Sequence, residues 1–234
     1  MSVFGPLGDP AAHTSQAAAG RGPQIRTPGI EDVPESFRAA LTQLRRAQPR
    51  QEAVVAEVPA PRRLAPFAVA LRAEIASPEA KVSSAHPVAR LRPTANEEEI
   101  LATGRMILLH DPAGQQSWGG DFRVVIYIRA ELEPEMGNDP LLASVAWTWL
   151  CEALEAHGVA YSHAGGTATR ILSESFGSLQ NRQASNDVEL RASWTPADTS
   201  FGTHLEAWAD MACSFAGLPP VPDGVVALPH IRRS

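Results

Sequence analysis

Residues 101–136 read LATGRMILLHDPAGQQSWGGDFRVVIYIRAELEPEM, two long apolar strands around a glycine-rich connection. In the first strand, residues 106–109 are all apolar, which is typical of a strand covered on both faces. In the second strand, apolar residues alternate with arginine, tyrosine and glutamate, so one face is expected to be covered. Pro134 should end this strand, because proline lacks the amide proton of a ladder donor. The stretch therefore predicts a hairpin at the centre of a sheet.

Upstream of this hairpin, the sequence predicts one helix and two strands. The helix is expected to begin near Pro34, to bury an apolar stripe with helical spacing and to end at Pro49. A short strand is expected over 53–58. A longer alternating strand is expected over 64–75, and it should start beyond Pro66 or lie at an edge there.

Downstream, the sequence predicts a helix, two strands and a last helix. Asp139 is expected to cap the first helix, which should end at Gly158. The remaining elements, in chain order, are strands over 167–175 and 186–194 and a helix between 199 and 216. Thr203 and Glu206 offer a capping box if that helix begins late.

The expected order is helix, three or four strands, helix, two strands, helix. Short links between consecutive strands favour antiparallel pairing, so the predicted class is α+β, with an antiparallel sheet and helices packed on one face. The same order occurs in bacterial secretion-chaperone-like folds, an analogy of topology that carries no function.

The domain organisation follows from composition. Residues 1–30 are rich in Gly, Pro, Ala and Ser and are expected to form a disordered tail. Residues 31–217 are expected to form one α+β domain, with a flexible insertion over 77–96. Residues 218–234 form a proline-rich tail.

Charge and cysteine content restrict the function. The formal net charge is −6, which argues against generic nucleic-acid binding, because such binding requires clustered positive charge. Lys81 is the only lysine, a bias that fits a GC-rich genome. No window approaches a membrane span, no secretory signal is evident, and the two cysteines make no disulfide framework. A cytoplasmic protein is expected.

Several phrases resemble an actinobacterial family known only as a domain of unknown function, number three thousand. The matching segments are RRLAPFAVAL (62–71), ATGRMILLHDPAGQQSW (102–118), GDFRVV (120–125), RAELEPEM (129–136), RASWTP (191–196) and AGLPP (216–220). The likeness spans about residues 34–229. It implies a cytoplasmic bacterial protein whose insertion and tails vary, and it implies no activity, cofactor or catalytic residue.

One candidate site is the acidic run Glu131, Glu133 and Glu135, followed by Asp139. Alternate residues of a strand share a face, so these carboxylates could bind a hard divalent cation. The alternative is a solvated strand edge whose acids pair with arginines across the sheet.

A second candidate is His110-Asp111, with Trp118 and Asp121 across the connection. A histidine–aspartate pair at a strand end could perform acid–base chemistry, because histidine titrates near neutrality. The alternative is a turn in which Asp111 bonds its own downstream backbone and Pro112 and Gly114 complete the bend.

Common catalytic and metal motifs are absent. The glycine pairs at 119–120 and 165–166 lack the residues of phosphate loops, and the familiar zinc spacings do not occur. Five tryptophans are frequent among so few aromatic residues, and Trp147 and Trp118 are the two that the predicted core faces do not place. For Trp147 core packing is favoured, and the alternative is an exposed partner contact. The sequence therefore predicts no catalytic residue, cofactor or metal.

Three functions remain open at this stage. The favoured one is a non-catalytic protein-binding or adaptor module with an unknown protein partner, as a dimer. The alternatives are an enzyme or small-ligand binder at the 110–123 hairpin end, and an RNA-contacting protein using Arg123, Arg129, Arg170 and Arg191 around Tyr127. The candidate ligand or partner residues are His110, Asp111, Trp118, Asp121, Arg123, Arg129, Glu131, Glu133 and Trp147.

Overall fold

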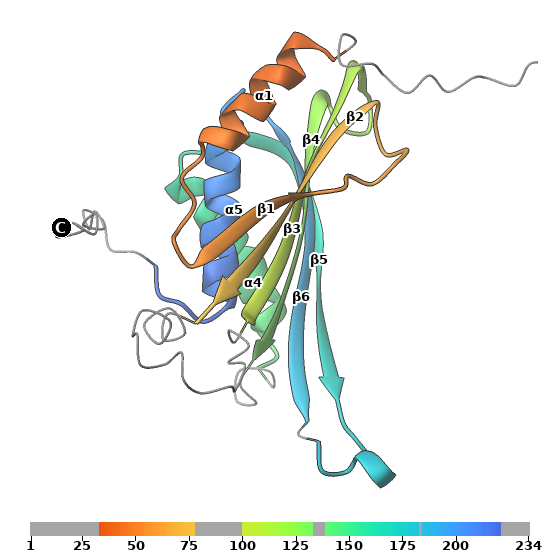
Figure 1. The fold of residues 1–234 in the computed structure, drawn as a ribbon, viewed down its shortest axis with the longest axis vertical. Coiled ribbons are helices and arrows are strands. Elements are labelled where there is room, and N and C mark those ends of the chain that lie inside the picture. The colour runs from red at the N-terminus through yellow and green to blue at the C-terminus, as the bar shows by residue number, and fades with distance from the viewer. Residues whose placement is uncertain (1–32, 78–99, 133–138, 183, 221–234) are drawn as a thin grey trace, which may run out of the picture. The chain divides into compact units, whose positions relative to one another are not determined.

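A six-stranded antiparallel sheet with helices on one face organises the chain in the computed structural model (Figure 1). The structure describes residues 33–77, 100–132, 139–182 and 184–220, which all belong to one unit. The predicted tail at 1–30, residues 221–234 of the predicted tail at 218–234, and nearly all of the predicted insertion lie outside these ranges. The elements are α1 (Glu35–Arg46), β1 (Ala53–Val58), β2 (Phe67–Ala76), β3 (Ile100–Gln115), β4 (Gly120–Leu132), α4 (Leu142–Ala156), β5 (Tyr161–Ser173), the single turn η3 (Gly177–Leu179), β6 (Ser185–Pro196) and α5 (Phe201–Phe215).

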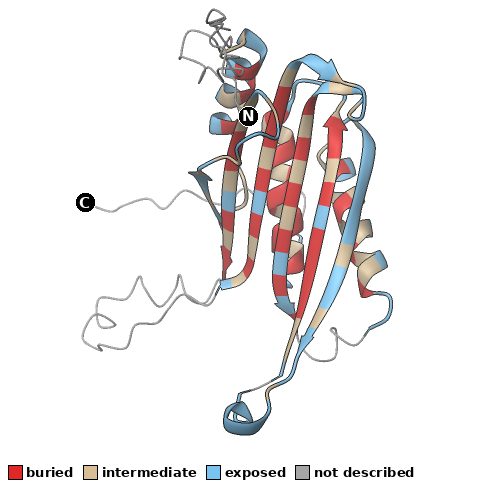
Figure 2. Cartoon of the chain, turned by 90° about the vertical axis from the view of Figure 1, so that its right-hand side faces the viewer, coloured by how far each residue is buried: buried red, intermediate tan, exposed pale blue. Residues whose placement is uncertain are grey.

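The strand order is β1-β2-β3-β4-β6-β5, and every neighbouring pair is antiparallel. The β3–β4 hairpin therefore lies in the middle, and the α+β prediction with four strands before α4 is confirmed. One face of the sheet packs against the helices. The other, here called the open face, has no helix of the described chain on it (Figure 2).

The core lies between the sheet and α5. Ten of the fifteen α5 residues are buried, because this helix packs against the sheet, α1 and α4. Gly104 on β3 leaves room for the Trp208 ring, whose Cζ2 lies 2.8 Å from where a Cβ would stand. On β4, the alternating apolar residues point into this core, as the sequence predicted.

Helix starts differ from the prediction. The N-cap position of α4 is Leu141, two residues after the predicted cap. Asp139 instead forms a local turn, in which its Oδ1 accepts a 2.8 Å hydrogen bond from the Leu141 amide. The condition for the capping box, a late start of the last helix, is not met, because α5 begins at Phe201 and Thr203 lies inside it. Glu206 instead accepts a hydrogen bond from the amide of Gln48.

Candidate functional site

His110 is buried on the helix side of the sheet. Its Nδ1 lies 3.1 Å from the carbonyl oxygen of Asp121, and its Nε2 lies 3.1 Å from Ser36 Oγ. Since a carbonyl can only accept, Nδ1 carries the proton and Nε2 accepts from the serine hydroxyl. The ring stacks on Phe122 at 4.1 Å and lies parallel to Phe37 at 5.9 Å. Both ring nitrogens are therefore engaged in structural hydrogen bonds: Nε2 joins the histidine to α1, and Nδ1 joins it to β4.

Asp111 has a local structural role. Its Oδ1 accepts from the amide of Ala113 and its Oδ2 from the side chain of Gln115, each at 3.1 Å. The residue pairing passes from His110↔Phe122 to Gln115↔Gly120, so four residues of β3 oppose one of β4 in a large bulge. The predicted aspartate–backbone bond is confirmed. The reversal of the chain, however, lies further on, at residues 116–119.

Arg123 ties three strands together on the open face. Its Nη1 donates to the carbonyl of His163 and to Thr195 Oγ1, both at 2.9 Å, and its Nη2 donates to Ser193 Oγ at 2.8 Å. Thr195 in turn donates to the carbonyl of Trp118. Burial without a charged partner lowers the pKa of the Arg123 guanidinium. Arg123 therefore connects β4, β5, β6 and the β3–β4 turn.

The turn fits closely under β5. Gly119 has φ +69°, and a Cβ there would lie 2.5 Å from Cε1 of the His163 ring. Only glycine suits this backbone conformation and this approach. The structure brings two of the predicted site residues together, because His110 Nδ1 lies 4.0 Å from Asp121 Oδ2, although the Asp121 side chain is more than half exposed. Arg123 is separated from this pair, since it lies on the open face while His110 lies on the helix side. The three residues do not converge on one pocket.

The open face of β4 and β6 carries charges that neutralise one another. Arg129 donates to both carboxylate oxygens of Asp187, at 3.3 and 3.1 Å. Glu189 accepts from the Tyr127 hydroxyl and from Arg191, each at 2.8 Å, and the Arg191 guanidinium lies 5.5 Å from the tyrosine ring centre. Burial, then the bond to Glu189, raises the Tyr127 pKa, while the bond to Asp187 raises that of Arg129.

Arg170 does not belong to this face. It pairs in register with Val188, a core residue, so its side chain lies on the helix side, where Nη1 donates to the carbonyl of Asp139. The prediction that four arginines share one surface is therefore wrong for Arg170. The remaining arginines, paired or clamped as described, do not form the unneutralised patch that phosphate binding requires.

The acidic exit of β4 is only partly described. Glu131 is exposed, while Glu133 and Glu135 lie outside the described residues. Within the described ranges, no group of three or more His, Cys, Asp or Glu side chains is placed to hold a metal ion.

The tryptophans divide into core and half-buried residues. Trp194 and Trp208 are fully buried. Trp149 is half-buried and meets Phe215 edge-on at 5.5 Å. Trp147 is half-buried too, and its Cζ3 lies 3.0 Å from the Cβ position of Gly166. Trp147 therefore covers Gly166 of β5 and remains partly exposed. Trp118 is half-buried in the turn.

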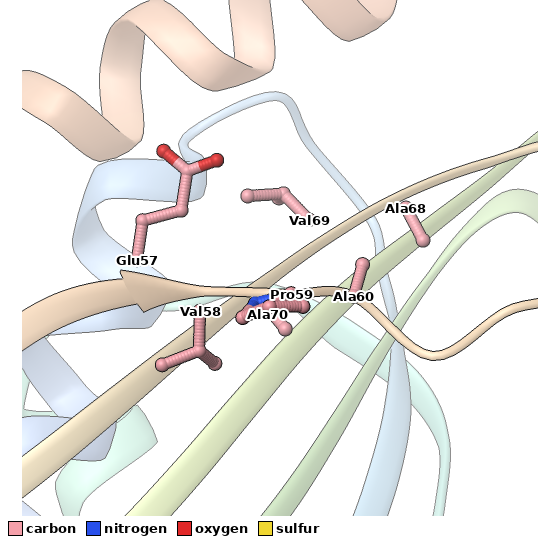
Figure 3. A pocket seen from close by; sticks show the side chains of 7 residues that line it. All are labelled: Glu57, Val58, Pro59, Ala60, Ala68, Val69 and Ala70. Atoms are coloured by element: carbon pink, nitrogen blue, oxygen red, sulfur yellow. The ribbon is translucent and has the colours of Figure 1, made fainter.

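A hollow of about 460 Å³ lies at the end of β1, and none of its lining residues belongs to the predicted hairpin end at 110–123 (Figure 3). Its lining consists of Glu57, Val58, Pro59, Ala60, Ala68, Val69 and Ala70. Glu57 is the one ionisable side chain among these seven residues. This lining offers apolar contact and one carboxylate, without the converging polar groups of a catalytic site.

The far end of the β5–β6 hairpin exposes apolar side chains that the sequence reasoning did not single out. Leu172 is 61% exposed, Phe176 76% and Leu179 48%. The hairpin extends past the other strands, and its end is coloured as exposed (Figures 1 and 2). The signal available beforehand was Phe176 itself, an aromatic residue between polar neighbours and outside any alternating pattern. These three residues are here called the hairpin tip.

Among the described residues, no helix has both the length and the apolar character needed to cross a membrane. No curated protein and no solved structure matches the chain. A family model does match it, over residues 33–226, with the description "Protein of unknown function (DUF3000)". Since that match covers most of the chain, the protein is a member of the DUF3000 family.

Proposed function

We propose that this protein is a non-catalytic binding module that holds a protein partner through the hairpin tip. The observation that carries the proposal is the exposure of Leu172, Phe176 and Leu179 within eight residues at the end of one hairpin. Exposed apolar side chains that gather in one place usually mark a contact surface, and aromatic residues dominate the binding energy of such surfaces.

The alternatives have less support. A ligand site at the 110–123 hairpin end would need His110 and Arg123 to face the same space, whereas they lie on opposite faces of the sheet. An RNA surface would need arginines free of carboxylates, and Arg129 is paired with Asp187. The observed positions of His110 and Arg129 therefore support a binding role better than catalysis or RNA contact.

We place the protein in the cytoplasm of an actinobacterium as part of the same proposal. Cys151 and Cys213 are both free thiols. Free thiols are typical of the reducing cytoplasm. The predominance of arginine over lysine agrees with a GC-rich genome.

Quantitative affinity capture tests the binding role. The full chain is tagged and expressed in its native host, together with a Phe176→Ser, Leu179→Ser variant and a Leu64→Ser control. Leu64 is 50% exposed, and it lies between β1 and β2, outside the hairpin tip. All three positions are exposed, so the substitutions should leave the fold intact. We expect the wild type and the control to recover a stoichiometric partner, and the tip variant to lose it. An untagged copy of the chain counts as such a partner.

Two results would overturn the proposal. One is equal recovery of the partner with the tip variant and the wild type. The other is recovery of no stoichiometric partner together with a strictly monomeric mass.

A further inference from the structure

The outer edge of β5 has the features of a strand that accepts another strand. β5 is the last strand of the sheet, so its outer row of backbone N–H and C=O groups has no partner strand in the described chain. From Gly165 to Ser173 its pairing with β6 runs without a register shift. No proline interrupts residues 165–176, and the charges there are Arg170 and Glu174. The opposite edge, β1, is only six residues long and is followed by Pro59. Bulges, prolines and short length are what usually protect an edge, and this part of β5 has none of them.

The sequence of this edge is complementary to itself when read antiparallel. With Leu172 opposite Leu172 of a second copy, Arg170 falls opposite Glu174, and Ala168 falls opposite Phe176. Directly opposed residues in an antiparallel pair lie close enough for ion pairs and apolar contacts. A centre at Arg170 would oppose two like charges, and a centre at Ile171 would leave both charges without an opposite. Of these three centres, Leu172 is the one that places each charge opposite a charge of the other sign.

The side chains involved are available for such pairing. Leu172, Arg170 and Glu174 are all exposed. The hydrogen bond of Arg170 to the carbonyl of Asp139 uses one amino group of the guanidinium, and Glu174 forms no ion pair within the described residues. Phe176 has extended backbone angles, φ −127° and ψ 163°, so the chain beyond β5 still follows a strand path there.

We propose that a second copy of this chain binds along residues 168–176, in antiparallel register about Leu172. The inference rests on the proposed function and names the partner of the same hairpin tip. It gives one continuous sheet in which the two β5 strands are neighbours. In this register even-numbered residues lie opposite even-numbered residues, and directly opposed side chains point to the same face of a sheet. Both copies therefore keep their helices on the same side of the joined sheet. The contact is isologous, since each Arg170 meets the other copy's Glu174.

Apolar area near the axis supplements the strand pairing. Leu172 lies on the two-fold axis, and Phe176 covers Ala168 of the other copy. Leu141 is 63% exposed and lies two residues after Asp139, whose carbonyl Arg170 contacts. A stable interface buries about 1,000 Å² or more, so side chains beside the paired strands are expected to contribute to the buried area.

Charge reversal tests this register in the full-length chain. Sedimentation velocity across a concentration series should show a species of twice the 25.0 kDa chain mass. Arg170→Glu alone and Glu174→Arg alone each place like charges opposite one another twice in the dimer. We expect either change to weaken dimerisation about tenfold or more. The double variant, Arg170→Glu with Glu174→Arg, should restore it.

The restoration cannot come from within one chain. Four residues along a strand separate the two side chains by about 13 Å. Arg105→Glu serves as the matched control, because Arg105 is an exposed arginine on the open face of β3 and should leave dimerisation unchanged. A Leu172→Cys variant treated with a short bismaleimide should form cross-linked dimers, while the wild type, with its own Cys151 and Cys213, measures the background.

The outcomes separate this inference from the proposed function. A chain that stays monomeric at all concentrations, or a double variant that fails to restore the dimer, overturns the register about Leu172. If such a monomer still loses a different protein partner on mutation of the hairpin tip, the binding role stands and the second copy is the wrong occupant. If the wild type dimerises, the single variants weaken the dimer and the double variant restores it, the register about Leu172 and the binding role are both supported.

Discussion

The indole Nε1–H of Trp194 donates a 3.0 Å hydrogen bond to Nδ1 of His204 inside the core. Both side chains are fully buried. Because Nδ1 accepts, the neutral histidine carries its proton on Nε2, which has no hydrogen-bond partner in the described structure. Burial lowers the pKa of His204 to about 4, and the charge of Asp198 opposes this only weakly.

This histidine predicts a loss of stability in mild acid. Unfolding returns its pKa to about 6.5, so between pH 6.5 and pH 4 the unfolded chain binds more protons than the folded one. The stability that the neutral His204 contributes is fully present above pH 6.5 and is lost as the pH falls towards 4. The free energy of unfolding should fall by roughly 3 kcal/mol across this window. Urea unfolding at several pH values measures it. His204→Phe should flatten the dependence in this window, and equal slopes for variant and wild type would contradict the prediction.

A matched pair of substitutions tests the Trp194–His204 bond. Trp194→Phe and Trp208→Phe each shrink a fully buried indole. Trp194→Phe also leaves His204 Nδ1 without its donor, whereas Trp208 Nε1 has no hydrogen-bond partner to lose. We expect Trp194→Phe to cost about 1–2 kcal/mol more in the free energy of unfolding. Equal costs would show that the bond contributes nothing.

Gly104 and Gly165 form a second matched pair. Alanine at Gly104 places its Cβ 2.8 Å from the Trp208 ring, in packed surroundings. We expect a loss of about 1–3 kcal/mol in stability, as for other overpacked cores. Alanine at Gly165 meets nothing within 4 Å and should be neutral or slightly stabilising. Thermal unfolding of both variants gives the comparison, and a tolerated Gly104→Ala would indicate a looser core.

Arg123→Lys tests the clamp across β4, β5 and β6. Lysine keeps the charge, but its single ammonium cannot reach Ser193, Thr195 and the His163 carbonyl together. We expect about 1–3 kcal/mol lower stability, with faster amide hydrogen exchange in β5 than in β3. Arg105→Lys is the control, since Arg105 is exposed on the same face. Unchanged exchange in β5 would refute the clamping role.

Local patterns predicted much of the fold. The bounds of β1 and the alternation of β4 agree with the sequence, because one buried face selects a period of two. For β5, the prediction began at residue 167, while the strand begins at Tyr161. Much of β5 is exposed on both faces, so burial selects no pattern there.

The candidate site was less predictable, because its contacts join distant residues. The sequence shows His110 beside Asp111, but not that its Nε2 lies 3.1 Å from the hydroxyl of Ser36, 74 positions earlier. The neutralisation of Arg129 by Asp187 depends on the register of β4 against β6. Neither partner can be identified from one strand alone. The aspartate–backbone bond at Asp111 was predictable because it spans only two residues.

The position of β6 between β4 and β5 has a kinetic consequence. Hairpins β3–β4 and β5–β6 each pair strands that follow one another along the chain, so each can close early and locally. The β4–β6 ladder instead joins strands separated by α4 and β5, and it pairs core residues of the two strands, such as Ile128 with Leu190. Closing that ladder is expected to limit the folding rate. Substitutions along it should slow refolding, whereas changes at β1 should mainly speed unfolding.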